Sequence, residues 1–372
     1  MRILFAGGGT GGHLFPIIAT IRELKRIAEE ERILDLELYY MGPSDFGTDL
    51  LKEEEVVTIQ VLSGKWRRYG SMENFFDFFR LPLGVLQALW SIFLLVPDVV
   101  FSKGGHGALP AVIAAAIFRI PIIIHESDAI PGKVNRISAR FAARIGIAFP
   151  GAAKHFPPEK TALVGIPLRR RILVGNREDA REAFDIYSAV PVVGIIGASQ
   201  GAERLNNTAL GIIKELTDAY EIIHQTGEKH LADVQGEASV ALEFTHKERY
   251  HPVGFLDESG IRDFYTACDL IVSRAGASSI FEIAARGKPS ILVPLSLAAQ
   301  NHQWENAYEY AAEGAAVIIE EVNLTPHVLL AEIKKLIDDQ DKMRKMGEAA
   351  GRFARPDSAE VIAKEILKLG VH

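Results

Sequence analysis

Residues 7–13 have the composition of a ligand-binding turn, because five glycines, Thr10 and His13 follow one another without interruption. An apolar run at residues 3–6 precedes this turn and an amphipathic stretch follows it, so a strand gives way to a helix here. Glycine lets backbone N–H groups approach a ligand closely, and the helix N-terminus adds about half a positive charge. The pattern predicts a loop for a phosphate or an acceptor group, with His13 beside it as a general base.

Two other interpretations of this turn stay open. Gly7, Gly9 and Gly12 also match the dinucleotide pattern G-x-G-x-x-G, which is a weak signal by itself. A dinucleotide site needs an acidic residue at the end of the second strand, roughly 20 residues on. The strand expected at residues 36–40 instead runs into Met-Gly-Pro-Ser and meets its first acid at Asp45. The other alternative is a structural turn with His13 as a helix cap.

A second group of chemical residues follows the strand expected at residues 270–273. Residues 273–279 read Ser-Arg-Ala-Gly-Ala-Ser-Ser, and Glu282 is expected to open a helix at residues 281–286. N–H groups and hydroxyls at a helix start suit a pyrophosphate, and Arg274 can neutralise its charge. Glu282 is placed to accept hydrogen bonds from a ribose diol. Favourable charge at a helix N-terminus is the alternative explanation for Glu282.

A polar stretch opens a further helix after the strand expected at residues 290–294. It contains Gln300, Asn301, His302 and Gln303, and Asn306 follows. Amides and an imidazole suit sugar hydroxyls, although an exposed helix start explains each residue singly. Together these groups predict that the second half of the chain holds a nucleotide diphosphate joined to a polar group. The first half then holds whatever reacts with it.

The composition limits the class of protein. A chain of 372 residues is too long for one ordinary core and suits two domains. The net charge of −7 argues against general nucleic-acid binding, because no broad basic surface is left to neutralise phosphates. The lone Cys268 excludes a disulfide scaffold and a thiolate zinc site. Since Met1 and Arg2 lead directly into the first strand, no secretory leader is expected and a cytosolic protein is predicted.

One apolar segment bears on membrane contact. Residues 81–97 contain no charged residue, are bracketed by Pro82 and Pro97, and are too short to span a bilayer, which takes about 20 residues. An aromatic-rich helix near basic residues is expected to lie at an anionic membrane surface. A buried crossover helix at residues 83–95 is the alternative. The neighbouring aromatic and basic residues that favour membrane contact are Phe75, Phe76, Phe78, Phe79, Lys65, Arg67 and Arg68.

Apolar runs of strand length alternate with helical stretches along the chain. They lie at residues 3–6, 36–40, 99–101, 121–125 and 145–148, and again at 191–196, 220–224, 270–273, 290–294 and 316–319. Strands that alternate with helices imply parallel sheets, and a second glycine loop at residues 197–202 restarts the pattern. We therefore predict an α/β fold with two Rossmann-like domains, residues 1–163 and 164–355, whose parallel sheets face each other across a cleft. The terminal helix expected at residues 358–369, within 356–372, is predicted to return to the first domain.

These motifs together resemble the MurG family, the UDP-N-acetylglucosamine:undecaprenyl-diphosphate-muramoylpeptide N-acetylglucosaminyltransferases of peptidoglycan synthesis, which have the GT-B glycosyltransferase fold. The match runs almost end to end. It rests on residues 7–13 with Pro16, on 104–110, on His125 and Glu126 with 130–132 and Asn135, on Gly165, Pro167 and Arg169, on 197–202 with Asn206, on 224–227, on 274–282, and on Gln303 with Asn306.

The resemblance implies transfer of N-acetylglucosamine from UDP-N-acetylglucosamine to the C4 hydroxyl of the muramoyl sugar of lipid I, with inversion, by a peripheral enzyme at the inner leaflet of the membrane. No cofactor besides the sugar nucleotide is implied. On the donor side it assigns Ser199, Gln200 and Arg274 to the diphosphate, Glu282 to the ribose, Phe255 and Leu256 to the uracil, and Asn206, His302 and Gln303 to the sugar. Thr10, Gly11, Gly12, Gly201, Ala277, Ser278 and Ser279 are further donor-binding residues in this resemblance. On the acceptor side it assigns Gly104, Gly105, His106, Gly107, Asp128, Asn135 and Arg169.

The chemistry needs a base near the acceptor hydroxyl and donors that stabilise the departing UDP. His13 is the first candidate base, and contact with an acceptor phosphate is its alternative role. Glu126 is the second candidate, and ordering of the acceptor loop is its alternative role. Arg274 and two helix N-termini can stabilise the leaving group, so the mechanism does not require a metal ion.

The chain departs from the family at four positions on the expected acceptor side. His106 stands where the family commonly has Tyr, Ser127 and Asp128 stand for Gln and Asn, and Ile166 stands for Asn. Asp128 would repel a lipid diphosphate unless a cation or His106 offsets its charge, so a modified lipid I is an alternative acceptor. The competing functions are a UDP-N-acetylglucosamine 2-epimerase, which can share this fold and donor site, and a non-catalytic module that binds a nucleotide sugar or lipid.

Overall fold

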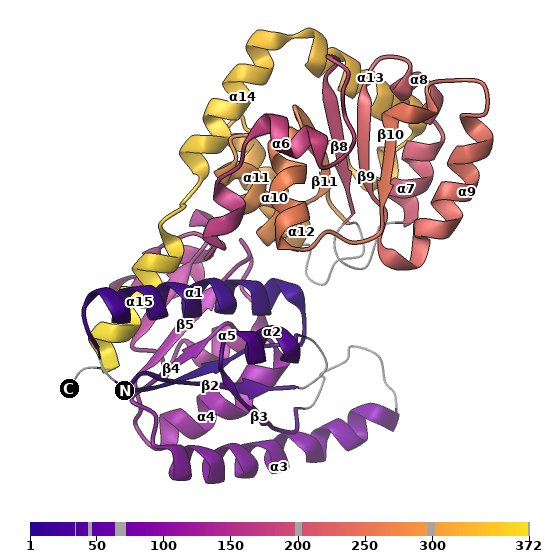
Figure 1. Cartoon of the computed structure of the whole chain (residues 1–372). Helices are drawn as coiled ribbons and strands as arrows, with labels where there is room; N and C mark the ends of the chain where they lie inside the picture. Colours follow the sequence, from indigo (N-terminus) through magenta and orange to yellow (C-terminus); the bar gives the residue numbers. More distant parts are fainter. Residues whose placement is uncertain (34, 44–46, 64–71, 198–202, 296–301, 371–372) are drawn as a thin grey trace. The chain divides into compact units, whose positions relative to one another are not determined.

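The computed structural model describes residues 1–33, 35–43, 47–63, 72–197, 203–295 and 302–370, without the side chains of residues 72–79. The chain divides into two compact units (Figure 1). Unit 1 comprises Met1–Arg169 and Pro356–His372, and unit 2 comprises Arg170–Arg355. The sequence analysis predicted the border between the two domains after residue 163. Unit 1 continues to Arg169 because Gly165 is tied to its sheet: its N–H donates to the Ile147 carbonyl, and its carbonyl accepts from Nε2 of His125 over 2.7 Å.

Unit 1 is built on a seven-stranded parallel sheet in the order β3-β2-β1-β4-β5-β6-β7. Its strands are β1 (Arg2–Ala6), β2 (Glu37–Gly42), β3 (Val57–Gln60), β4 (Val99–Ser102), β5 (Ile122–Glu126), β6 (Arg144–Ile147) and β7 (Thr161–Leu163). The five apolar runs predicted in this half are all strands. The two strands that the sequence analysis missed, β3 and β7, are the edges of the sheet, where no residue is fully buried and a continuous apolar run is not needed.

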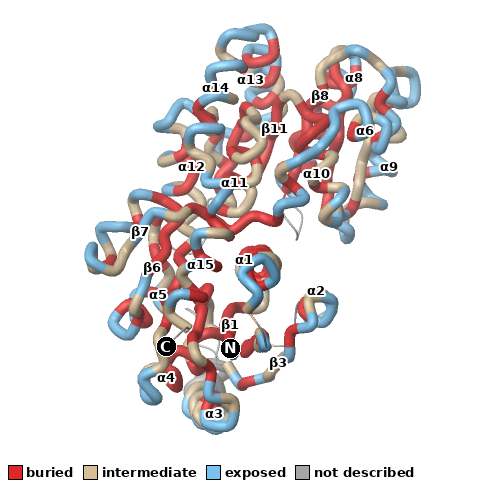
Figure 2. Tube along the Cα trace, turned by 60° about the vertical axis from the view of Figure 1, so that its left-hand side comes forward, coloured by how far each residue is buried: buried red, intermediate tan, exposed pale blue. Residues whose placement is uncertain are grey.

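Helices cover both faces of this sheet. Along β1, Ile3 and Phe5 belong to one apolar cluster, while Leu4 and Ala6 belong to the other, as the alternation of side chains along a strand requires. The central strands β1, β4 and β5 are therefore apolar on both faces and buried (Figure 2). The helices are α1 (Gly11–Glu30), α2 (Thr48–Glu53), α3 (Met72–Leu95), α4 (Leu109–Ile117), α5 (Lys133–Ser138) and α15 (Ser358–Gly370), with one-turn or two-turn segments η1 (His106–Ala108), η2 (Pro150–His155) and η3 (Pro158–Lys160).

The terminal helix α15 is part of unit 1, where the sequence analysis placed it. Ile362, Ala363, Ile366 and Leu367 join the apolar cluster formed by β1 and α1. Two ion pairs flank this contact: the Arg26 guanidinium lies 3.6 Å from Glu360, and the Arg144 guanidinium lies 2.8 Å from Glu365.

The long helix α3 differs from the prediction. Pro82 was expected to bracket the apolar segment, but the helix begins at Met72 and runs through Pro82. A proline inside a helix removes one backbone hydrogen bond, and the packing of Ala88 and Ile92 in the core offsets this loss. The helix expected at residues 83–95 therefore starts earlier than predicted. Among the described residues, the structure contains no helix with the length and apolar character to cross a bilayer.

Unit 2 is built on a six-stranded parallel sheet in the order β10-β9-β8-β11-β12-β13. Its strands are β8 (Val192–Ile196), β9 (Glu221–Gln225), β10 (Tyr250–Val253), β11 (Leu270–Arg274), β12 (Ser290–Val293) and β13 (Ala316–Ile318). The five predicted runs are strands here too. The sequence analysis missed β10, an edge strand that contains Pro252, which a central strand would not tolerate.

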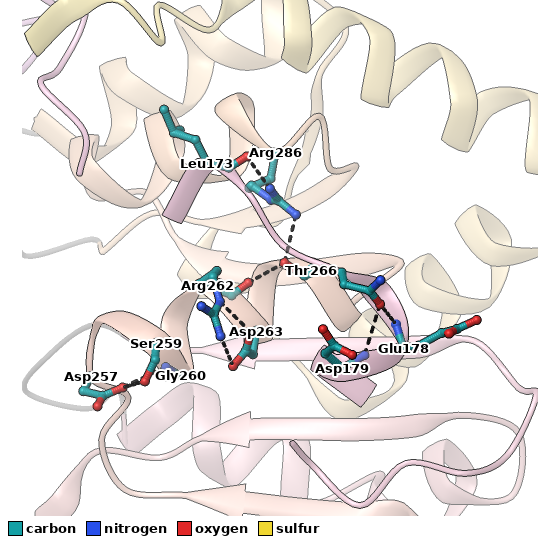
Figure 3. Close-up of polar contacts among 11 residues, drawn as sticks. Leu173, Glu178, Asp179, Asp257, Ser259, Gly260, Arg262, Asp263, Thr266 and Arg286 are labelled. Atoms are coloured by element: carbon teal, nitrogen blue, oxygen red, sulfur yellow. Dashed lines mark hydrogen bonds and ion pairs between the residues drawn. The ribbon is translucent and has the colours of Figure 1, made fainter. Parts of the chain in front are cut away.

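The helices of unit 2 pack on both faces of its sheet. They are α6 (Arg177–Glu182), α7 (Glu203–Leu210), α8 (Ile213–Thr217), α9 (Leu231–Ala241), α10 (Glu258–Ala267), α11 (Ala277–Ala285), α12 (His302–Ala312), α13 (Pro326–Asp338) and α14 (Gln340–Phe353), with short turns η4 (Arg170–Leu173), η5 (Glu228–His230), η6 (Lys247–Arg249) and η8 (Glu321–Asn323). Polar side chains cap several of them. Asn176 accepts the N–H groups of Glu178 and Asp179 at the start of α6, and Asp257 accepts that of Gly260 in α10 (Figure 3).

Arg286 ties the beginning of unit 2 to its helices. Its Nη1 donates to the carbonyl of Leu173 at the end of η4, and its Nη2 donates to Thr266 Oγ1 over 2.8 Å (Figure 3). The Thr266 hydroxyl in turn donates to the carbonyl of Arg262. This chain of bonds fixes η4 against α10 and α11, and α11 is the helix that carries the residues predicted for the diphosphate and the ribose.

Candidate active site

The glycine turn of unit 1 lies between β1 and α1 and holds His13 in the first turn of the helix. Thr10 is the N-cap residue of α1, and its Oγ1 lies 2.8 Å from Nδ1 of His13. Gly8 and Gly105 flank the imidazole, since a Cβ on Gly8 would lie 3.1 Å from Nδ1 and one on Gly105 would lie 3.2 Å from Nε2. Side chains at these two positions would displace the ring, so glycine is needed on both sides of it.

Burial and neighbouring charge lower the pKa of His13 to about 4. Burial is the largest cause, and Lys103 and His106 add to it. The imidazole is therefore uncharged at neutral pH. When its proton lies on Nδ1 and is donated to Thr10, Nε2 keeps the lone pair that a general base requires.

Residues 104–107 follow β4 and lie against this turn. Gly104 and Gly105 have φ angles of +81° and +79°, which disfavour any other residue. A Cβ on Gly104 would lie 2.5 Å from Oδ1 of Asn135, and one on Gly107 would lie 2.6 Å from the carbonyl oxygen of Gly7. The structure thus brings the two glycine loops of unit 1 together, with Asn135 behind them.

Glu126 ends β5, and hydrogen bonds occupy both of its carboxylate oxygens. Oε1 accepts the N–H of Asp128 at 3.0 Å, while Oε2 accepts the N–H of Gly132 at 3.0 Å and Nδ2 of Asn135 at 2.9 Å. Burial raises the pKa of this carboxyl, with a further increase from the charge of Asp128. Three donors, two from the loop after β5 and one from α5, favour the loop-ordering role of Glu126 over its role as a base.

Lys103 is a site residue that the sequence analysis missed. It directly follows β4, is 2% exposed, and donates from Nζ to the hydroxyl of Ser127. Burial lowers its pKa to about 8, against the raising influence of Glu126 and Asp128. The one signal in the sequence was a lone charged residue between an apolar strand and Gly104, which carries no periodicity of its own.

Arg169 and Ile166 are both buried in unit 1. The Arg169 guanidinium lies over the ring of Phe15, 4.4 Å from its centroid, so it packs on the helix that carries His13. Ile166, one of the departures from the family pattern, is fully buried. Gly11 is buried and Gly12 is exposed in the first turn of the same helix.

In unit 2, Arg274 ends β11 with its guanidinium already paired. Nη2 donates to Oε1 of Glu321 over 2.6 Å, and Nη1 donates to the carbonyl of Val293. Both side chains of the ion pair are at least nine-tenths buried. The sequence analysis missed Glu321, which lies 47 residues further along the chain and shows no local pattern.

The helix after Arg274 begins earlier than predicted. It starts at Ala277, so Ala277, Ser278 and Ser279 form its first turn, and Glu282 lies in its second turn rather than opening it. The expectation that Glu282 begins this helix is wrong, and so is the explanation of Glu282 as N-terminal helix charge. Its Oε2 instead accepts the hydroxyl of Tyr265 at 3.0 Å, and the side chain remains partly exposed.

Asn206 is buried in α7 and hydrogen-bonded through both ends of its amide. Nδ2 donates to the carbonyl of Thr226, and Oδ1 lies 3.1 Å from Nε2 of His224. Because Oδ1 can only accept, His224 carries its proton on Nε2, and its Nδ1 accepts the Tyr250 hydroxyl at 2.9 Å. Asn206 therefore orders the end of β9 in the described structure.

The remaining donor-side residues lie around the ends of β10 and β12. Phe255 is 55% exposed and Leu256 is half-buried, just after β10. Gln303, in the first turn of α12, accepts the N–H of Leu295 through Oε1, and the neighbouring His302 is partly exposed. Ser199, Gln200, Gly201, Gln300 and Asn301 lie outside the described residues, as do Lys65, Arg67 and Arg68 and the side chains of Phe75, Phe76, Phe78 and Phe79.

We found no group of three or more His, Cys, Asp and Glu side chains able to hold a metal ion in the part of the chain that the structure describes. The site residues within each unit are instead a neutral imidazole, a buried lysine and glycine loops in unit 1, and a buried arginine with a helix N-terminus in unit 2. In both units these groups lie at the carboxyl ends of parallel strands, where α/β proteins bind ligands.

Comparison with known proteins defines the class. Residues 3–147 match the glycosyltransferase family 28 N-terminal domain, and residues 192–362 match the glycosyltransferase family 28 C-terminal domain. The structure is similar to crystal structures of MurG from Acinetobacter baumannii, with a TM-score of 0.75, 25% identity and 99% of each chain covered, and of the UDP-GlcNAc 2-epimerase from Neisseria meningitidis, with a TM-score of 0.71, 13% identity, and 99% and 100% covered. The second likeness shows the fold alone. The predicted GT-B glycosyltransferase fold is confirmed.

The curated relatives define the family within this class. A UDP-N-acetylglucosamine--N-acetylmuramyl-(pentapeptide) pyrophosphoryl-undecaprenol N-acetylglucosamine transferase of Bacillus thuringiensis is 35% identical over 90% of this chain and 91% of its own length. One from Legionella pneumophila is 33% identical over 98% of this chain and 96% of its own length. The chain belongs to this family of N-acetylglucosamine transferases, the MurG family, as the sequence motifs indicated.

Proposed function

We propose that this protein transfers N-acetylglucosamine from UDP-N-acetylglucosamine to the C4 hydroxyl of the muramoyl sugar of lipid I, forming lipid II and UDP. The observation that carries the proposal is the end-to-end similarity to relatives named for this transfer. It favours the transferase over the 2-epimerase, whose likeness extends to the fold alone.

The residues of unit 1 supply the acceptor chemistry in this proposal. Nε2 of His13 takes the proton of the C4 hydroxyl as the oxygen attacks the anomeric carbon, and the bond from that carbon to the UDP oxygen breaks on the opposite face. Inversion follows from this single displacement. The support is the neutral state of the buried imidazole and its fixation by Thr10.

Unit 2 holds the donor in this proposal. The first turn of α11, with Ser278 and Ser279, offers N–H and hydroxyl donors to the diphosphate. Glu282 is partly exposed in the next turn and accepts from the ribose. Because Arg274 is bonded to Glu321, its main role is to hold the end of β11, and its positive charge reaches the diphosphate from the interior. We propose that no cofactor besides the sugar nucleotide is needed.

The protein is proposed to act at the inner leaflet of the membrane as a peripheral enzyme. The apolar face, defined here as the exposed side chains of Leu83, Leu86, Trp90, Phe93 and Leu94 on α3 with Phe118 after α4, supports this proposal. Trp90 and Phe93 stack with ring centroids 6.2 Å apart, and Phe93 lies 6.4 Å from Phe118. Aromatic side chains gathered on one surface are typical of a lipid contact.

Sugar transfer from radiolabelled UDP-N-acetylglucosamine to a soluble lipid I analogue tests the reaction. We expect a β-linked product by NMR and turnover that persists in EDTA. Conversion of the donor to its 2-epimer without acceptor would instead establish the epimerase. Donor binding without any product would leave a nucleotide-sugar-binding module. Product formation that stops in EDTA and returns with a divalent cation would contradict the proposal of no cofactor.

A further inference from the structure

Lys103 lies at the junction of the loops that surround His13. Its backbone N–H donates to the carbonyl of Ala6, the last residue before the glycine turn, over 2.8 Å. Its Nζ bonds to Ser127 Oγ in the segment after β5. Gly104 and Gly105 turn away immediately behind it. Because its backbone N–H and its ammonium group are both hydrogen-bonded, Lys103 holds its positive charge at one fixed point near the carboxyl ends of β1, β4 and β5.

The charged and titratable groups around this point come from several elements. Lys103 and His106 on η1 lie close enough to His13 on α1 to disfavour its charged form. Glu126 at the end of β5 and Asp128 after it act on the Lys103 ammonium, which in turn disfavours a charge on His125 of β5. Tyr40 on β2 donates its hydroxyl to the carbonyl of Gly7 and, with a pKa of about 12, stays neutral. The positive charge that acts on the His13 imidazole therefore comes from the Lys103 ammonium and from His106, while the two carboxylates act on the ammonium.

We propose that Lys103 is a positioning residue of the transfer reaction, which ties the segment containing Ser127 and Asp128 to the loop beside His13 and extends the base form of His13 to lower pH. This inference rests on the proposed function, because it assigns Lys103 a part in that reaction. The Lys103 ammonium is the cation that offsets Asp128, one of the departures from the family pattern, and Ser127, another departure, is its hydrogen-bond partner.

Removing the Lys103 ammonium would change the balance of charge around His13. Without Lys103, the buried Glu126 and the partly buried Asp128 would lose a positive charge that acts on both, and a proton on His13 would meet less repulsion. The base form would then be lost at a higher pH. A second effect follows from the bond to Ser127, since release of that segment would loosen the loop that carries Asp128.

An NMR titration of His13 tests the electrostatic part without any substrate. Histidine-labelled protein would be titrated as the natural chain, K103M, K103R and K52M, and the His13 signal would be assigned by its loss in H13N. We expect His13 to titrate near a pKa of about 4 in the natural chain, K103R and K52M. In K103M it should rise by about one unit and stay below the ordinary 6.5, because burial still lowers it. Lys52 is the matched control, since it lies on the surface beside Asp49.

A His13 pKa that is the same in K103M and K52M would overturn the proposal. Circular dichroism identifies variants that do not fold. If K103M unfolds, K103M/D128N, which removes one charge of each sign, takes its place, and the His13 pKa should be higher in it than in D128N alone. If K103R shifts His13 as much as K103M does, the charge of Lys103 is not the cause and the proposal fails.

The pH profile of kcat/KM for the acceptor links this result to the reaction. The acidic limb should move to higher pH in K103M by the shift of the His13 pKa that NMR measures. A rise of this pKa to about 5 would about halve the fraction of His13 in its base form at pH 5. K103R should restore the limb. If the natural chain transfers no sugar while His13 still responds to Lys103, the proposed function fails and the role of Lys103 in it falls too. If transfer is normal and the limb does not move, the Lys103 proposal fails alone.

Discussion

Arg274 and Glu321 form a buried ion pair inside unit 2, with Nη2 of the arginine 2.6 Å from Oε1 of the glutamate. The arginine ends β11 and the glutamate begins η8, so the pair joins the centre of the sheet to the segment after its edge strand β13. A guanidinium that sequence motifs assign to a ligand is thus first a structural link. The carboxylate of Glu321 already offsets the positive charge of Arg274 before any diphosphate binds.

We expect E321A to destabilise the protein by about 3–5 kcal/mol, because the substitution leaves the Arg274 cation buried and unpaired. The adjacent E320A is the matched control. Glu320 is only partly buried and accepts a surface hydrogen bond from the Tyr308 hydroxyl, so its replacement should cost less than about 1 kcal/mol. Urea unfolding would measure the free energy of unfolding of both variants. Equal decreases in E321A and E320A would contradict the structural role of the ion pair.

H13A should lower kcat/KM about 10²–10⁴-fold, because the general base is lost. T10V should lower it less, since Thr10 only orients the ring through its hydroxyl. Calorimetric binding of UDP-N-acetylglucosamine should stay unchanged in H13A, which separates chemistry from donor affinity. Unchanged turnover in H13A would eliminate His13 as the base.

E126Q should raise the KM for the acceptor while leaving the acidic limb of the pH profile in place. A glutamine keeps only one accepting oxygen at this position, and its NH2 group would face at least one of the three donors from Asp128, Gly132 and Asn135. The loop after β5 would therefore lose a hydrogen bond and loosen. Steady-state kinetics at several pH values measure both quantities. A lost acidic limb in E126Q, with acceptor KM unchanged, would show that Glu126 is the base after all.

Replacing Leu86, Trp90 and Phe93 together by Ser should reduce co-sedimentation with anionic phospholipid vesicles several-fold without changing the thermal midpoint, because the three side chains are exposed. V240S/F244S is the control, since both residues are exposed apolar side chains of unit 2. If the two variants lose the same fraction of vesicle binding, the apolar face on α3 is not the membrane contact.

Stability should fall as the pH drops from about 6.5 towards 4. Burial lowers the pKa of His13 to about 4 and of His224 to about 3, so these residues are neutral in the folded chain and protonated in the unfolded chain across this range. Each contributes a loss of about 1.4 kcal/mol per pH unit within its range, and nothing above it. Urea unfolding of H224Q between about pH 6 and pH 4.5 should show a shallower slope than the natural chain. If stability falls as steeply with pH in H224Q as in the natural chain, the neutral state of His224 in the folded chain is not the cause.

The sequence predicted the central strands and the loops at their ends because both have local signals. A strand covered on both faces needs a continuous apolar run, and a close turn needs glycine. The edge strands β3, β7 and β10 lack that run, which is why they were missed. The helices expected at residues 83–95 and 281–286 start earlier in the structure, at Met72 and Ala277, where packing decides the boundary.

The polar partners within the site were beyond sequence reasoning. Lys103 meets Ser127 and Arg274 meets Glu321 only because parallel strands bring distant segments to one edge of a sheet. Glu126 was the second candidate base and the resemblance assigned Asn206 to the sugar, and neighbours from the fold donate to or accept from both side chains. The assignments of Ser278, Ser279, His302 and Gln303 to the donor stay predictions.

The position of α15 has a consequence for how the chain is made. Unit 1 is split between the two ends of the sequence, and its apolar cluster is closed by Ile362, Ile366 and Leu367. During synthesis the first 169 residues leave the ribosome without this last helix, while unit 2 is continuous and can fold as soon as it emerges. The half of the enzyme that is translated first is therefore the half that matures last.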